Sequence, residues 1–240
     1  MADKKTVIVT GASQGIGAAT ARAFLDRGYN VVATARSMSG AGFAASANLL
    51  VVDGDIGQDA TAEKVVKAAM DTFGAIDHVV NCAGIFKAKP FTDYTIEEFR
   101  AFVSVNLEGF VFLTQRAVRQ MLAQGRGGSV TTITAALADN PMTDSSASVA
   151  MITKGGLNTV TRCLANEYAK SHIRFNAVAP GVVNTPLHKG LAMDAGNSRA
   201  PMGTFSEATD ITAAVIYLTE AEHVTGEILY VDDGAHVGRW

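Results

Sequence analysis

Short runs rich in β-branched residues recur along the 240-residue chain, and most of them are apolar on both faces. The runs are Thr6–Thr10, Asn30–Thr34, Asn48–Asp53, His78–Asn81, Ser129–Thr134, Phe175–Pro180 and Ile228–Val231. Strands that are apolar on both faces are typical of parallel sheets covered by helices on each side. Amphipathic segments separate the runs, and such an alternation of strand and helix means parallel pairing with right-handed crossovers. We therefore predict an α/β fold with one doubly wound domain over residues 1–240, built on a seven-stranded, mainly parallel sheet flanked by helices.

Local signals mark where helices start and stop. After Gly15 the apolar residues follow one helix face, and Gly28 is expected to end that helix. Thr95 and Glu98 form a capping-box pattern that opens a long helix with the sequence IEEFRAFVSVNLEGFVFLTQRAVRQML. The stretch 37–47 is rich in Gly, Ala and Ser and too short for the usual crossover helix, so we expect a loop there.

Composition and charge exclude several classes of function. The formal net charge is −3 and the basic residues are scattered, so no basic surface is expected for nucleic acid or for an anionic membrane. Cys82 and Cys163 lack metal-ligand spacing, which argues against a metal site and indicates reduced thiols in the cytoplasm. The amino terminus has no signal-peptide pattern, and no apolar stretch approaches the roughly 18 residues needed to span a bilayer. We expect a cytoplasmic protein that does not enter a membrane.

The stretch VIVTGASQGIG places Gly11, Gly15 and Gly17 between the end of an expected strand and the start of a helix. Glycine permits a tight turn and a close approach of the backbone to a ligand, while the free N–H groups at the helix start attract a pyrophosphate. In this strand–turn–helix context the pattern predicts a Rossmann-type dinucleotide site. We expect the neighbouring residues Ser13, Gln14 and Ile16 to line the same site.

The spacing G-x-x-x-G-x-G resembles that of the classical short-chain dehydrogenase/reductase family, and the likeness extends through nearly the whole chain. Asn81-Cys82-Ala83-Gly84 is similar to the family's N-N-A-G segment, and VTGEILYVDDG is similar to its closing strand, with Asp233 where a Gly is usual. The resemblance implies the strand order 3-2-1-4-5-6-7, a small-molecule substrate and a homo-oligomer, either a dimer or a tetramer.

The same resemblance implies which residues contact the cofactor. Asp55 and Ile56 correspond to a pair that contacts adenine, and Asn106 corresponds to an Asn with structural and catalytic roles. The implied cofactor contacts beyond the glycine-rich turn are Asp55, Ile56, Asn81, Ala83, Gly84, Lys154, Pro180, Gly181, Val183 and Thr185.

The end of the second expected strand indicates which dinucleotide binds. The position that would carry an acidic residue for a ribose 2′-hydroxyl holds Ala35, and Arg36 follows it. A guanidinium can bind a 2′-phosphate through charge-assisted hydrogen bonds, with Ser37 as a second donor. The alternative is that Arg36 stacks on adenine or points to solvent. We expect NADP(H) in preference to NAD(H).

The reactive end departs from the family pattern. In the resembled family, a Tyr four residues before a Lys donates a proton to the substrate carbonyl, and the Lys lowers the pKa of that phenol and holds the ribose hydroxyls. A Ser at a neighbouring strand end polarises the carbonyl. Lys154 is present, but Ala150 stands at the Tyr position and Ala135 at the Ser position. Tyr168 lies after Lys154 and is expected to be structural.

Two substitutes for the phenol are open. Loss of a positioned general acid forfeits about 10²- to 10⁴-fold in rate, which leaves room for slow turnover through a water held by Lys154. The other substitute is a loop hydroxyl, and we place Ser146 in the catalytic set with Lys154 and Asn106. Further hydroxyls nearby are those of Thr134, Thr143, Ser145 and Ser148.

Each member of this set also has a structural alternative. The hydroxyls could serve turns and helix caps, Lys154 could only bind the ribose, and Asn106 could only brace a helix bend. His188 and Met193 fall in the variable stretch after Thr185, whose composition suggests a modest, mostly apolar substrate.

Two interpretations follow. The first is an NADP(H)-dependent oxidoreductase that acts on a carbonyl or alcohol with an atypical proton donor. The second is a catalytically silent dinucleotide-binding protein that serves as a sensor, a scaffold or a subunit of a mixed oligomer. We favour the enzyme, because the nicotinamide half of the expected pocket keeps Asn81, Lys154, Pro180 and Thr185.

Overall fold

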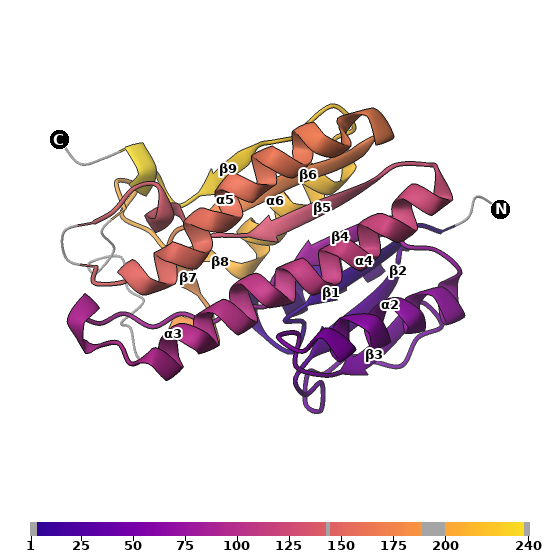
Figure 1. Ribbon diagram of the computed structural model, residues 1–240, viewed down its shortest axis with the longest axis horizontal. Helices are drawn as coiled ribbons and strands as arrows, with labels where there is room; N and C mark the ends of the chain where they lie inside the picture. Colours follow the sequence, from indigo (N-terminus) through magenta and orange to yellow (C-terminus); the bar gives the residue numbers. More distant parts are fainter. Residues whose placement is uncertain (1–3, 143–144, 189–199, 238–240) are drawn as a thin grey trace.

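Seven parallel strands form one sheet in the order β3-β2-β1-β4-β5-β6-β9 in the computed structural model, which describes residues 4–142, 145–188 and 200–237 (Figure 1). The strands are β1 (Thr6–Thr10), β2 (Asn30–Ala35), β3 (Leu49–Asp53), β4 (His78–Asn81), β5 (Gly128–Ile133), β6 (Ile173–Pro180) and β9 (Ile228–Val231). The predicted strand order and the doubly wound architecture are confirmed, since β9 takes the seventh place.

The strand limits differ slightly from the predicted runs. β3 begins at Leu49 because the N–H of Leu49 donates to Ser46 in a turn. β6 begins earlier than predicted, because Ile173 pairs with Gly128 at the start of β5. Thr134 lies just beyond β5 rather than inside it.

Helices cover both faces of the sheet. They are α1 (Gly15–Asp26), α2 (Asp59–Phe73), α3 (Ile96–Phe102), α4 (Gly109–Gln124), α5 (Ser148–Tyr168) and α6 (Ala208–Glu220). Short 3₁₀ turns are η1 (Phe91–Asp93), η3 (Ala136–Ala138), η4 (Ala169–Ser171), η5 (Pro186–His188) and η7 (Ala235–Val237). One apolar cluster packs α1 and α6 against the sheet, and a second packs α2, α4 and the end of α5 against its other face. The core therefore has two layers, as strands that are apolar on both faces require.

The predicted local signals are found with one change. Gly28 follows α1 with φ of 80°, and the capping box of Thr95 and Glu98 opens α3. The predicted long helix is interrupted by a π-helical turn, η2 (Val103–Glu108), before it continues as α4. No helix lies between β2 and β3, so the crossover through residues 36–48 is a loop, as expected.

A second, two-stranded sheet was not predicted. β7 (Val183–Asn184) pairs in parallel with β8 (Ser206–Glu207). Strands of this length carry no periodic pattern that sequence reasoning can detect. The pair flanks residues 189–199, so the predicted substrate-side residue Met193 lies outside the described residues.

Within the described ranges, no helix combines the length and the apolar character that crossing a bilayer requires.

Candidate functional site

The carboxyl ends of the central strands border one cavity of about 1200 Å³. Every predicted cofactor contact except Asn81 lines it: Gly11, Ser13, Gln14, Gly15, Ile16, Gly17, Arg36, Ser37, Asp55, Ile56, Ala83, Gly84, Lys154, Pro180, Gly181, Val183 and Thr185. Asn81 is buried behind the wall, where its side-chain amide donates to the Thr114 hydroxyl at 3.0 Å. The structure thus brings residues from six separate stretches of sequence to the place where ligands bind in doubly wound sheets.

At the phosphate end the turn after β1 is built from backbone. Gly11 and Gly15 have φ of 67° and 53°, a region that residues with a Cβ seldom adopt. A Cβ on Gly17 would lie 2.3 Å from the carbonyl oxygen of Gly11. Thr10 ties this turn to the next strand end, because its hydroxyl accepts the N–H groups of Cys82 and Ala83. The turn leaves N–H groups at the start of α1 available to an anion.

At the adenine end Arg36 and Ser37 follow β2 directly, and both are exposed. The carboxylates of the neighbouring strand are tied to backbone. Asp53 accepts the N–H of Met38 at 2.8 Å, and Asp55 accepts the N–H two residues further on at 3.0 Å. A guanidinium is therefore the exposed charge at the tip of β2.

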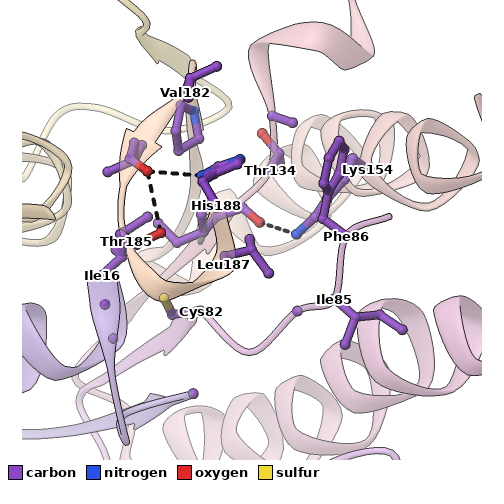
Figure 2. A pocket seen from close by; sticks show the side chains of 18 of the residues that line it. Ile16, Cys82, Ile85, Phe86, Thr134, Lys154, Val182, Thr185, Leu187 and His188 are labelled. Carbon is purple, nitrogen blue, oxygen red and sulfur yellow. Dashed lines mark hydrogen bonds between the residues drawn. The ribbon is translucent and has the colours of Figure 1, made fainter. Parts of the chain in front are cut away.

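Lys154 projects from α5 into the reactive end of the cavity (Figure 2). Its Nζ donates to the carbonyl oxygen of Ile133 at the end of β5, at 2.8 Å. A Cβ on Gly84 would lie 3.2 Å from Nζ, so the ammonium reaches the wall that β4 contributes. Burial lowers the pKa of Lys154 to about 8. Burial also raises the pKa of the Cys82 thiol on the same wall to about 12, which keeps that thiol neutral.

Ala150 and Ala135 are the positions at which the resemblance leads us to expect a Tyr and a Ser. Ala150 is 0% exposed and belongs to a cluster with Phe102 and Val149, against which Phe86 packs. Phe86 and Lys154 both line the cavity (Figure 2). Ala135 lines the cavity with its methyl group. Ala150 therefore lies in an apolar cluster, and Ala135 adds no acid to the cavity wall.

No tyrosine replaces the absent one. All five tyrosines of the chain are among the described residues, and none of them lines the cavity: Tyr29, Tyr94, Tyr168, Tyr217 and Tyr230. Tyr168 packs against the core residue Phe175, with ring centres 5.8 Å apart, which agrees with a structural role.

Asn106 lies in the π-helical turn and is buried. Its Oδ1 accepts the N–H of Ile85 at 2.9 Å, and its Nδ2 donates to the carbonyl of Ile85 and to the Thr153 hydroxyl. The side chain thus joins the helix bend to the segment after β4 and to α5. This geometry favours bracing over proton relay.

The loop before α5 brings a different serine to the cavity than predicted. Ser145 lines the cavity, whereas Ser146 is exposed, does not line it, and accepts a backbone hydrogen bond from Lys89. Thr134 faces the cavity, but its hydroxyl donates to the carbonyl of Val178 at 3.3 Å. Ser148 is exposed at the first turn of α5. Thr143 lies outside the described residues.

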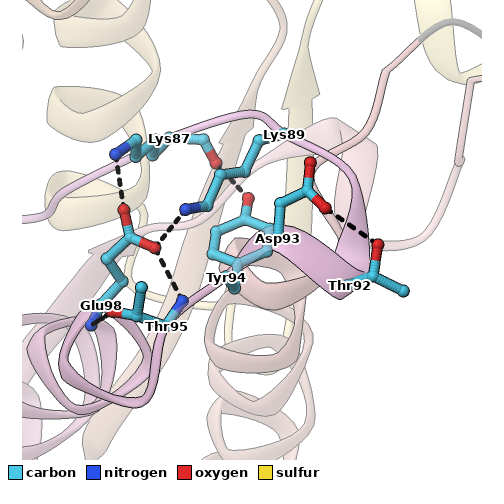
Figure 3. Close-up of polar contacts among 7 residues, drawn as sticks. All are labelled: Lys87, Lys89, Thr92, Asp93, Tyr94, Thr95 and Glu98. Carbon is cyan, nitrogen blue, oxygen red and sulfur yellow. Dashed lines mark hydrogen bonds and ion pairs between the residues drawn. The ribbon is translucent and has the colours of Figure 1, made fainter.

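The segment that carries Phe86 is held by contacts that Lys87 and Lys89 make with Glu98 and Tyr94 (Figure 3). Glu98 pairs with Lys87 at 2.5 Å and also with Lys89, while Tyr94 donates to the carbonyl of Lys87. Hydrogen bonds from Lys87 and Lys89 lower the pKa of Glu98 to about 2. This clamp holds residues 85–89 over the reactive end.

Two histidines that sequence reasoning left out of the catalytic set also line the cavity. His188 lies in η5, and its Nδ1 bonds the carbonyl of Val183 at 2.9 Å. His236 lies in η7, where its Nδ1 bonds Asp232 at 2.9 Å and its ring stacks on Tyr230. Both follow strands in stretches with no regular pattern, so only their residue type could have drawn attention to them.

A family model described as enoyl-(acyl carrier protein) reductase matches residues 11–236. The chain is 36% identical over 233 residues to 3beta-hydroxysteroid dehydrogenase 1 of Eggerthella lenta, covering 89% of this chain and 86% of that protein. It is 33% identical over 218 residues to a 3-oxoacyl-[acyl-carrier-protein] reductase of Bos taurus, covering 89% of this chain and 90% of that protein.

A solved structure shares the fold. It is a 3-ketoacyl-(acyl-carrier-protein) reductase from Brucella melitensis complexed with NADH, with a TM-score of 0.88 and 29% sequence identity. The match covers 97% of this chain and 98% of the other.

Proposed function

The chain belongs to the short-chain dehydrogenase/reductase family, an oxidoreductase family that acts on small molecules, and from that premise we propose that it is an NADP(H)-dependent oxidoreductase of a carbonyl or alcohol substrate with an atypical proton donor. The observation that carries the proposal is that one cavity joins the glycine-rich turn to Lys154. A protein that only recognised adenine would have no need for a buried ammonium at the other end.

The residues of the cavity fit a nicotinamide dinucleotide. The turn from Gly11 to Gly17 has room for a ligand only because position 17 has no Cβ. The same turn leads into the start of α1. When bound, a reduced nicotinamide supplies a hydride to an electrophilic carbon. Lys154 is positioned to bind ribose hydroxyls, and its charge is retained at pH values below about 8.

Arg36 supports NADP(H) as the preferred cofactor. It is exposed at the tip of β2 where an acidic residue would repel a 2′-phosphate, and the adjacent Asp53 is bonded to backbone. Charge-assisted hydrogen bonds to phosphate are among the strongest that a side chain can make.

The substrate end supports a mostly apolar small molecule. Its apolar wall includes Phe86, Leu137, Met142, Met151, Leu187 and Phe205. Side chains of this kind exclude water from a reacting carbonyl and strengthen any hydrogen bond made to it.

The test is to mix the purified protein with NADPH and a panel of apolar ketones and aldehydes and to follow the absorbance of the reduced nicotinamide. Turnover that depends on a member of the panel is expected. Tight NADPH binding without turnover of any carbonyl or alcohol would instead favour the silent binding protein, which the burial of Ala150 among apolar side chains also fits.

We also propose that the enzyme works in the cytoplasm as a homo-oligomer, either a dimer or a tetramer. Light scattering of the purified protein measures its molar mass, and a monomer would contradict this proposal.

A further inference from the structure

Reduction of a carbonyl requires one proton, and few groups along the cavity can supply it. Among the residues that the structure describes, the titratable side chains along the cavity are those of Arg36, Asp55, Cys82, Lys154, His188, Asp232, Asp233 and His236. Arg36 and Asp55 lie at the adenine end. The Cys82 thiol has a pKa of about 12, too high for efficient donation near neutral pH.

The carboxylates at the end of β9 are engaged as acceptors. Asp233 receives the hydroxyl groups of Thr204 and Ser206 at 2.7 and 2.8 Å. Asp232 is buried and receives the backbone N–H and the ring nitrogen of His236. Neither acid is arranged to give up a proton, so the two histidines and Lys154 remain.

The hydrogen bond to Val183 fixes the protonation of Nδ1 in the His188 ring, and the role of Nε2 is then to be assigned. The carbonyl of Val183 can only accept a hydrogen bond, so Nδ1 of His188 carries the hydrogen in that 2.9 Å contact. The neutral ring then has its lone pair on Nε2, and the protonated ring has an acidic N–H there. A backbone carbonyl that fixes the tautomer in this way is how a histidine is prepared for proton transfer.

The position of His188 also suits the reaction. Its ring centre is 6.1 Å from that of Phe86, and His188, Phe86 and Lys154 line the same cavity (Figure 2). His188 follows Thr185, which lies against the glycine-rich turn, since a Cβ on Gly15 would be 3.3 Å from it. The imidazole therefore belongs to the segment that spans from the phosphate turn to the reactive end.

The ring of His236 makes different contacts from the ring of His188. Its ring is stacked on Tyr230 with centroids 4.4 Å apart, and its Nδ1 is bound to a buried carboxylate. It contacts the outer strand of the sheet and the η3 turn. This placement makes it a competing candidate to be tested beside His188.

We propose that His188 is the proton donor that replaces the absent phenol. This inference rests on the proposed function. In the reduction, the carbonyl carbon gains a hydride from NADPH, the C=O π electrons move to oxygen, and that oxygen takes the proton of the His188 Nε2–H. The products are the alcohol, NADP⁺ and a neutral imidazole, which regains its proton from water. Oxidation of the alcohol is the reverse, with neutral Nε2 as the base.

Charged and titratable groups from several elements influence this proton. Lys154 on α5, Asp232 and Asp233 after β9, and Cys82 after β4 line the same cavity as His188. Because the donor is the protonated ring, the rate of reduction should fall with rising pH.

The kinetic test compares His188→Gln with His236→Gln and with His223→Gln, an exposed residue outside the cavity. Glutamine can keep a hydrogen bond to Val183 but has no proton to give near neutral pH. We expect His188→Gln to lower carbonyl reduction by about 100-fold or more and to flatten its pH profile, while the Kd for NADPH changes less than about twofold. His236→Gln should lose less, and His223→Gln should not change.

A second readout does not depend on turnover. In protein labelled with ¹⁵N-histidine, the signals missing from His188→Gln identify His188. We expect the Nδ1–H tautomer, an Nε2 that titrates, and a shift of the Nε2 signal when NADP⁺ and the product alcohol are added together. An Nε2–H tautomer at neutral pH, or an Nε2 that the alcohol does not affect, would overturn the inference.

The outcomes separate this inference from the proposed function. If the natural protein reduces carbonyls and His188→Gln does so equally well, His188 is not the donor and the proposed function stands. If His236→Gln shows the larger loss, the donor is the other histidine. If the natural protein binds NADPH but reduces no carbonyl, both the proposed function and the role of His188 are wrong.

Discussion

At the phosphate end of the cavity we expect backbone N–H groups beside Gly11, Gly15 and Gly17 to bind the ligand, whereas at the reactive end we expect side chains to do so. Backbone recognition is rigid, because the φ values of Gly11 and Gly15 and the 2.3 Å approach at Gly17 leave no room for change. At the reactive end Ala150 and Ala135 stand where the resemblance to the family leads us to expect hydroxyl groups, and the sheet has the strand order expected of the fold. We therefore propose that nucleotide binding and proton transfer are separable in this fold.

The largest effect is expected from Gly17→Ala. The new methyl group would displace the backbone of Gly11, at a cost of about 3 kcal/mol or roughly a 100-fold weaker affinity for any dinucleotide. Gly155→Ala is the matched control, because an added Cβ there meets nothing within 4 Å, and helix propensity should make that variant about 1 kcal/mol more stable. Titration calorimetry measures both affinities. Equal affinities for the dinucleotide in the two variants would show that binding does not depend on the turn at Gly17.

Arg36→Ala tests the choice of cofactor at the adenine end. Loss of charge-assisted hydrogen bonds worth about 1.5–3 kcal/mol should weaken NADPH by roughly 10- to 100-fold and NADH by less than about threefold. The dissociation constants for NADPH and NADH, measured in the variant and in the natural protein, check this prediction. Equal losses for the two cofactors would mean that Arg36 does not bind the 2′-phosphate.

Lys154→Met tests whether the reactive end and the adenine end of the cavity bind the cofactor independently. We expect NADPH to bind roughly tenfold more weakly, because the ribose beside nicotinamide loses an ionised donor. The fragment 2′,5′-ADP, which fills only the adenine end, should bind as before. A loss for the fragment as large as the loss for NADPH would show that the two ends are not independent.

The smallest effect is a pH dependence confined to the reactive end. The ammonium of Lys154 is present below about pH 8 and is lost as the pH rises through that value, because burial has lowered its pKa. Its contribution to NADPH affinity should therefore decline between pH 7 and 9, by about tenfold at most. In Lys154→Met the decline should be absent. An identical pH profile in both proteins would assign the titration to another group.

Most of the fold and the phosphate end could be predicted from the sequence, because both depend on local rules. Runs that are apolar on both faces require helices on each side, and glycines at fixed spacing require a particular turn. That Ala150 and Ala135 stand in place of a catalytic Tyr and Ser stays a prediction from the sequence around Lys154.

The remainder of the site depends on tertiary contacts. Ser145 rather than Ser146 faces the cavity because Lys89 holds the backbone of Ser146, a contact across the fold. His188 and His236 reach the cavity from irregular turns, where no periodic pattern indicates direction. Asn106 is fixed by Ile85, whose position depends on the course of the chain after β4.

We propose that this pocket binds a nucleotide and transfers protons without a tyrosine. The most direct measurement is the rate of NADPH-dependent carbonyl reduction in the double variant Tyr94→Phe/Tyr230→Phe. These phenols are the ones beside the site, since Tyr94 packs against the cluster at Ala150 and Tyr230 stacks on His236. We expect a rate within about threefold of the natural protein. A loss of about 100-fold with unchanged NADPH affinity would mean that a phenol is the acid and would contradict the account.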